Sequence, residues 1–151
     1  MGRLRHLILL LPILCLACSR PALVHSFLPV PEDGWRRTDT LVFPLPPAQD
    51  EAQCSLYVGL RLHNRFPLRE VWLGIEHRMG TDEGWSCDTL CLRLSDEKGR
   101  LSGQGINLLQ YEVAAGSLHM PAGQEGELRI HHLMRCETLP DIMEVGIRLS
   151  R

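Results

Sequence analysis

The pattern of apolar and polar positions is clearest between residues 55 and 77, where it predicts two strands joined by a short turn. The apolar residues at alternate positions are Leu56, Val58, Leu60, Leu62, Val71, Leu73 and Ile75. Because successive side chains of a strand point to opposite faces, this alternation predicts one buried face on each strand. Residues 64–69, which include Pro67, are where we expect the chain to reverse.

The same alternation predicts shorter strands elsewhere in the chain. They lie at residues 40–43, 90–94, 128–131 and 145–149. Ser95–Gly99 has the composition of a tight hairpin turn with Gly99 in a left-handed conformation. Residues 106–113 have apolar side chains at both odd and even positions, which predicts either a buried strand or one short helix. Strands separated by Gly, Pro and Asp clusters, without a long amphipathic helix, predict an all-β fold, a single antiparallel β-sandwich.

The first 17 residues have the pattern of a bacterial export signal. Arg3 and Arg5 precede an apolar run from Leu7 to Ala17, and about eleven residues are too few to span ~30 Å of hydrocarbon. The run ends at Leu16-Ala17-Cys18, which resembles a lipobox. We therefore predict a lipoprotein signal peptide over residues 1–17 and a lipidated Cys18, in preference to an ordinary secretory signal with Cys18 as a bystander.

Cleavage at this site leaves a length typical of one domain. Residues 18–33 are predicted as the lipidated cysteine and a proline-rich tether, and residues 34–151 as the sandwich. The chain has 16 basic and 18 acidic residues, so loss of Arg3 and Arg5 gives a net charge of −4. No basic stripe indicates nucleic-acid binding. Ser19, in place of aspartate, favours an outer-membrane location, and the lack of an acidic run beside Cys18 favours the periplasmic leaflet.

The mature chain keeps four further cysteines, Cys54, Cys87, Cys91 and Cys136. In an exported protein they are disulfide candidates, and three pairings are open. A strand would hold Cys87 and Cys91 ~13 Å apart, too far to bridge, so that pairing needs a loop. Buried free thiols are the second interpretation. A zinc site with His131 and His132 is the third, and it is disfavoured because adjacent strand residues face opposite sides.

Candidate contact residues are few, and none indicates catalysis. The sequence has no nucleophile elbow, zinc-protease motif or phosphate loop, so neither a catalytic site nor a cofactor is predicted. The three tryptophans, Trp35, Trp72 and Trp85, are candidates for a partner or ligand surface, because they fall on the polar parity or in loops. His132 and Arg135 lie where alternation breaks, which indicates either a polar partner patch or a bulge with an edge histidine.

Short motifs along nearly the whole mature chain resemble the gliding-motility lipoprotein GldH family of the Bacteroidota, and they occur in the same order after a lipobox. They are Gly34-Trp35 with Asp39, Arg65-Phe66-Pro67-Leu68-Arg69-Glu70-Val71-Trp72-Leu73, Asp88-Thr89-Leu90, Asp96, Gly99-Arg100, Gly103 with Gly105, Tyr111, His132-Leu133-Met134-Arg135, Leu139, Ile142 and Glu144-Val145-Gly146-Ile147. Each motif alone is weak, and the ordered set is fairly specific.

The resemblance implies a non-enzymatic accessory of the gliding apparatus and its linked secretion machinery. It implies a membrane-anchored protein, and together with the residues after Cys18 we predict a periplasm-facing outer-membrane lipoprotein whose partners are the lipid bilayer and envelope proteins. It carries a role over to one position only, Cys18. The alternative function is carbohydrate binding or nutrient capture, which requires tryptophans exposed on a concave face.

Overall fold

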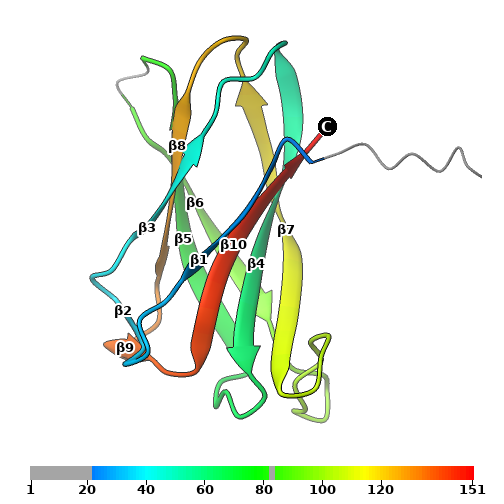
Figure 1. Ribbon diagram of the computed structural model, residues 1–151. Helices are drawn as coiled ribbons and strands as arrows, with labels where there is room; N and C mark the ends of the chain where they lie inside the picture. Colours follow the sequence, from blue (N-terminus) through cyan, green and yellow to red (C-terminus); the bar gives the residue numbers. More distant parts are fainter. Residues whose placement is uncertain (1–21, 82–83) are drawn as a thin grey trace, which may run out of the picture.

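The computed structural model describes residues 22–81 and 84–151, which form two large antiparallel sheets, a two-stranded ribbon and, within these ranges, no helix (Figure 1). The predicted all-β antiparallel sandwich is confirmed. The predicted signal peptide and Cys18 lie outside the described residues. In chain order the strands are β1 (Val24–Pro29), β2 (Trp35–Arg36), β3 (Leu41–Leu45), β4 (Ala52–His63), β5 (Glu70–Met79), β6 (Ser86–Arg93), β7 (Leu108–Met120), β8 (Gly126–His132), β9 (Thr138–Leu139) and β10 (Ile142–Ser150).

The strands form two four-stranded sheets, in the orders β1-β10-β4-β7 and β3-β8-β5-β6, and a small ribbon of β2 and β9. The two strands of the clearest sequence pattern, β4 and β5, lie in different sheets. The proline-bearing turn at residues 64–69 therefore carries the chain from one sheet to the other, and it is not the tip of a hairpin. Each of these strands is central in its sheet, with a hydrogen-bonded neighbour on both sides.

The core lies between the sheets and contains the residues that alternation predicted. Those that are at most 4% exposed include Leu56, Val58, Leu60, Leu62, Val71, Leu73, Ile75, Leu128, Ile130, Val145, Ile147 and Leu149. Burial of one such side chain stabilises the fold by about 1.5–3 kcal/mol. The ambiguous stretch at residues 106–113 falls mainly in β7, which is a strand and not a helix. The stretch looked ambiguous because Ile106 belongs to the preceding loop and Leu108 points outward (44% exposed), whereas Leu109 faces the core.

The predicted tether is wrong for residues 24–29, which form the edge strand β1. Every residue from Val24 to Pro29 pairs with β10, and the pairing continues through a hydrogen bond from Leu23 N to Leu149 O (2.8 Å). Proline indicated a flexible segment, but Pro29 closes an edge strand, where a missing N–H leaves no ladder bond unmade. Ordered structure therefore begins well before the expected boundary at residue 34.

An aromatic side chain on the outer face holds β1 to its sheet. Phe27 lies across Gly146 of β10 and towards Gly59 of β4, and these two glycines are paired in register. A Cβ atom on Gly146 would lie 2.6 Å from the Phe27 ring, and one on Gly59 would lie 3.0 Å from it. The Arg61 guanidinium covers the other side, 4.0 Å from the ring centroid. The two glycines thus form a shallow seat for this ring.

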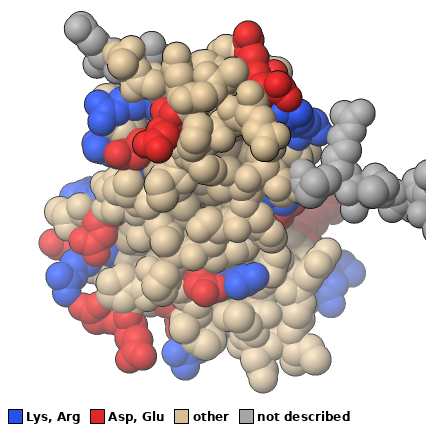
Figure 2. Space-filling view, turned by 45° about the horizontal axis from the view of Figure 1, so that its top comes forward, with Lys and Arg blue, Asp and Glu red and all other residues tan. Residues whose placement is uncertain are grey.

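Several charged side chains on the surface are arranged as ion pairs. Figure 2 shows acidic and basic groups side by side around the margin of one face, with a broad uncharged area between them. Arg61 Nη1 lies 2.6 Å from Glu144 Oε2, and Arg148 pairs with Glu112.

Within residues 22–81 and 84–151 no helix is long and apolar enough to cross a membrane.

Candidate interaction surfaces

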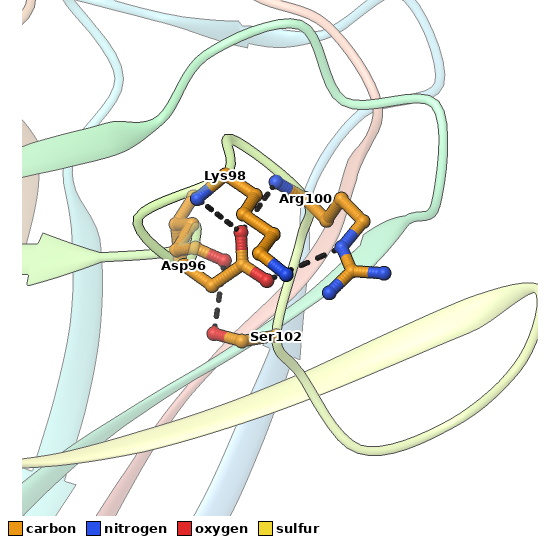
Figure 3. Close-up of polar contacts among 5 residues, drawn as sticks. Asp96, Lys98, Arg100 and Ser102 are labelled. Atoms are coloured by element: carbon orange, nitrogen blue, oxygen red, sulfur yellow. Dashed lines mark hydrogen bonds and ion pairs between the residues drawn. The ribbon is translucent and has the colours of Figure 1, made fainter.

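The β6–β7 loop, residues 94–107, is held in one shape by Asp96 (Figure 3). Its Oδ1 accepts hydrogen bonds from the backbone N–H of Lys98 and of Arg100, both at 2.9 Å. These bonds, the Arg100 bond first, hold the pKa of the Asp96 carboxyl below its usual range. Gly99 follows with φ +78°, so the predicted turn at Ser95–Gly99 is confirmed.

A buried tyrosine fixes the other half of this loop. The Tyr111 hydroxyl donates to Leu94 O at 2.9 Å, and burial raises the pKa of this phenol. Gly103 packs against the Tyr111 ring, where a Cβ would lie 2.6 Å away. Gly105 has φ +128° and no room for a side chain, because a Cβ would meet Leu108 O. The Gly-x-Gly pattern is therefore a packing requirement and not a phosphate-binding loop.

The β6–β7 loop is tied to the β4–β5 turn. Asn64 Nδ2 donates to Ile106 O at 3.0 Å, and Asn64 N donates to Asn107 O at 3.0 Å. Arg65 Nε donates to Asp141 Oδ1 at 2.7 Å, which joins the same turn to the β9–β10 connection. Between the two loops lies a hollow of about 500 Å³, lined partly by Arg65, Phe66 and Arg100. Ile106 stands at its rim with 85% of its surface exposed. We call the two loops, residues 64–69 and 94–107, the loop end of the sandwich. It brings together four motifs that are separate in the sequence: Arg65–Leu73, Asp96, Gly99-Arg100, and Gly103 with Gly105.

Two of the predicted contact residues, Trp35 and His132, are buried, so the prediction that they form a partner surface is wrong. Both are 0% exposed, and their rings meet edge to face with centroids 5.5 Å apart. Trp35 Nε1 donates to Asp39 O (3.0 Å), and His132 Nε2 donates to Trp35 O (3.1 Å). Strand parity misplaced Trp35 because β2 is only two residues long and is covered by β9, which is distant in the sequence.

Because of His132, we expect the stability of the protein to fall as the pH drops below about 6.5, the pKa of an unfolded histidine. Burial lowers the pKa of its imidazole, and its Nδ1 is buried without a hydrogen-bond partner among the described residues. The unfolded chain, with a histidine pKa of about 6.5, then takes up more protons than the folded one as the pH drops below that value. Burial also lowers the pKa of His77, which adds to the effect.

Thermal unfolding of the wild type and of His132→Gln at several pH values checks this expectation. Glutamine keeps a donor for Trp35 O but does not titrate, so the melting temperature of the variant should fall less steeply with acid. A pH slope that is equal in the two proteins contradicts the assignment to His132.

Trp72 is exposed and rigidly held. It is 42% exposed on the outer face of β5, and its Nε1 donates to Glu70 Oε1 at 3.0 Å. Its backbone O accepts from Leu133 N at 2.8 Å, and Leu133 is 45% exposed. Trp72 and Leu133 therefore present neighbouring apolar surface at the end of β8, beside the exposed Arg135. Trp72 and Arg135 are both exposed, and their role in a partner surface stays a prediction.

Trp85 has its ring covered. The Arg129 guanidinium lies 4.0 Å and that of Arg78 4.7 Å from the ring centroid. Cation–π contacts of this kind stabilise an exposed site by about 0.5–1 kcal/mol and occupy the surface on which a sugar would stack. Sequence reasoning could not foresee this, because Trp85 precedes β6 whereas the two arginines lie on β5 and β8.

The predicted disulfide is not formed within the chain, and the four described cysteines are free thiols. Cys54 is buried, and burial raises its pKa. Cys87 and Cys91 lie on one face of β6, four residues apart, where an extended strand keeps them ~13 Å from one another. Cys136 is exposed.

The zinc interpretation lacks a ligand set in the described part of the chain. His131 lies against Gly74 on the outer face, whereas His132 is buried between the sheets. Over residues 22–81 and 84–151, no three His, Cys, Asp or Glu side chains are grouped so that they could hold a metal ion.

Comparison with known proteins gives one consistent match. Residues 22–149 match the model of the GldH lipoprotein family. Over 157 aligned residues the chain is 22% identical to the gliding motility lipoprotein GldH of Flavobacterium johnsoniae, with 96% of this chain and 94% of that protein covered. Among solved structures, the Eiger TNF from S. frugiperda aligns with 87% of this chain and 94% of its own, at 9% identity and a TM-score of 0.33. That score is too low to support an argument.

Proposed function

Because the chain belongs to the GldH lipoprotein family, we propose that it is a non-enzymatic accessory of the gliding-motility envelope machinery and its associated secretion system. The family match over residues 22–149 carries this proposal, since it spans almost the whole sandwich. The protein acts by contact: it holds a partner protein near the membrane through its rigid loop end and through the Trp72–Leu133 surface.

A non-enzymatic role is consistent with how the polar side chains are used. Arg61 is engaged with Glu144, and Asp96 is engaged with the backbone of its own loop. The buried His132 donates to a backbone carbonyl. Each of these three side chains stabilises the fold, and none of them lines the hollow between residues 64–69 and residues 94–107.

Attachment to the membrane is the second part of the proposal. Cys18, outside the described residues, carries the lipid in the outer membrane, and the sandwich faces the periplasm. β1 begins at Val24, which pairs with Leu149 close to the C-terminus. The loops at residues 64–69 and 94–107 lie at the opposite end of the sandwich (Figure 1).

Apolar side chains at that end supply candidate contacts. Ile106 is 85%, Leu108 44% and Leu133 45% exposed, and apolar residues with a polar rim are typical of protein interfaces. A carbohydrate platform is less favoured, since arginines cover Trp85 and the buried Trp35 is inaccessible. Nothing in the sequence indicated that Ile106 lies on the surface, because it stands at the start of an apolar stretch that was predicted as a buried strand or a short helix.

Crosslinking in intact envelopes, followed by affinity capture, tests the proposal. The natively lipidated protein should capture a specific envelope protein, and Cys18→Ala should lose that protein because it is no longer held at the membrane. Ile106→Ser and Trp72→Ser should each weaken the capture. Val42→Ser is the matched control, because Val42 is also exposed (43%) but lies on β3.

Reciprocal capture from the identified partner must return this protein. Recovery of periplasmic bystanders alone, together with retention of the protein on a polysaccharide column, would refute the proposal and favour the glycan-binding alternative. Circular dichroism of each variant separates loss of contact from loss of fold.

A further inference from the structure

β6 is an edge strand of the sandwich that has no proline, lysine or bulge to block pairing. The four edge strands of the two large sheets are β1, β7, β3 and β6. β1 ends at Pro29 and β3 contains Pro44, and β7 carries a bulge between Ala114 and Gly116. β6 (Ser86–Arg93) has no proline, lysine or bulge. Its outer side therefore keeps a continuous row of N–H and C=O groups with which another strand can pair.

Two thiols lie on the same face of this edge and are symmetric about Thr89. Cys91 pairs across the sheet with Trp72, and Cys87 pairs with Glu76, so both point outward. If a second β6 runs antiparallel to the first with Thr89 opposite Thr89, each Cys87 lies opposite Cys91 of the second copy. Residues opposite one another in antiparallel strands have Cα atoms ~4.5–5.5 Å apart, which is within the ~4.4–6.8 Å range of disulfides.

We propose that two copies of this chain pair edge to edge through β6 in this register and are joined by two Cys87–Cys91 disulfides. In each bond the two thiols lose two protons and two electrons as the sulfur–sulfur bond forms. The electrons and protons pass to a disulfide-containing oxidant in the compartment to which the protein is exported, and this oxidant is reduced to a dithiol. The product has one continuous eight-stranded sheet, β3-β8-β5-β6 followed by the same strands of the second copy in reverse order.

The covalent bonds, and not the strand pairing alone, hold the dimer together. Asp88 pairs with Ile75 and so points to the inner side, where the second copy places Leu90 opposite it. A charge that points inward from an edge strand weakens pairing. Reduction of the disulfides should therefore separate the two chains.

The pairing also sets the orientation of the dimer. Antiparallel β6 strands turn one sandwich end over end, so the two β1 strands begin at opposite ends of the dimer. With the anchor proposed above, the four Cα-to-Cα steps from Cys18 to Ala22 span at most ~14 Å. Both lipid anchors can then enter the same membrane if the strands of the dimer lie parallel to the membrane surface.

Non-reducing gels of the full chain test this proposal. Thiols are blocked with N-ethylmaleimide in intact cells before lysis, so that no bond forms afterwards. The wild type should migrate as a dimer that dithiothreitol converts to monomer. Cys87→Ser and Cys91→Ser, each expressed alone, should abolish the dimer, since each bond needs one cysteine of each kind. Co-expression of the two variants should restore it through one bond per pair.

Three further variants complete the test. Cys136→Ser, which removes the other exposed thiol, should leave the dimer intact. Thr89→Lys, which brings two charges together at the symmetry axis, should cause loss of the dimer, whereas Val42→Lys on β3 should not. The proposal is overturned if the wild type is monomeric with blocked thiols, if Cys91→Ser alone still dimerises, or if co-expression fails to restore the band. Equal melting temperatures of the monomeric variants show that each has folded.

Discussion

Replacement of Trp35 by alanine is expected to lower the free energy of unfolding by about 3–5 kcal/mol. Trp35 is completely buried, and its loss opens a large cavity that the neighbouring strands cannot fill. The substitution also removes the edge-to-face contact with His132 and leaves Asp39 O without its indole donor. Since small domains are stable by only ~5–15 kcal/mol, part of the population should unfold at physiological temperature.

Urea denaturation of the soluble domain, followed by far-UV circular dichroism, measures this effect without relying on tryptophan fluorescence. Trp72→Ala is the matched control, because it is the same substitution at a position that is 42% exposed, and it should cost less than about 1 kcal/mol. Similar losses for the two variants would show that Trp35 does not have the buried role described above.

Replacement of Gly146 by valine is expected to destabilise the protein by about 1–3 kcal/mol and to release β1. The first side-chain carbon would lie 2.6 Å from the Phe27 ring, so the ring must leave its seat. Phe27 is the side chain that crosses from β1 onto β10 and β4, and its displacement should expose the backbone of residues 23–30. Hydrogen–deuterium exchange of that segment, together with urea denaturation, gives the two measurements.

A double variant separates this clash from the general cost of an added side chain. In a Phe27→Ala background there is no ring to displace, so Gly146→Val should cost much less than it does in the wild type, with a coupling of about 0.5–3 kcal/mol. Gly84→Val is a control for valine at an open site, since a Cβ there meets nothing within 4 Å. Additive effects of Phe27→Ala and Gly146→Val would contradict the proposed seat.

The sequence predicted best where a strand is long and lies against the core. Leu56 and Val71 belong to alternating runs in β4 and β5, and every predicted inward residue there is buried. In such strands parity fixes the orientation of a side chain once one neighbour is known, because the period is two residues. The turn at Ser95–Gly99 was equally predictable, because aspartate and glycine favour this backbone locally.

Local pattern failed where burial depends on a segment far along the chain. β1 was predicted as tether because its prolines are visible in the sequence, whereas the seat for Phe27 is made by Gly146 and Gly59, more than 30 residues away. Trp35 was placed on the surface because a strand of two residues has no detectable period. Its cover comes from β9 and His132.

The all-β sandwich and the motifs of the GldH family could thus be predicted from the amino-acid sequence alone. Which tryptophan contacts solvent, which cysteines share a face, and which loops meet were decided by tertiary structure. The physical reason is that the exposure of a side chain depends on which other segment of the chain packs against it. Trp85 lies beneath arginines of two other strands, and the symmetry of Cys87 and Cys91 about Thr89 acquires meaning only because β6 lies at an edge.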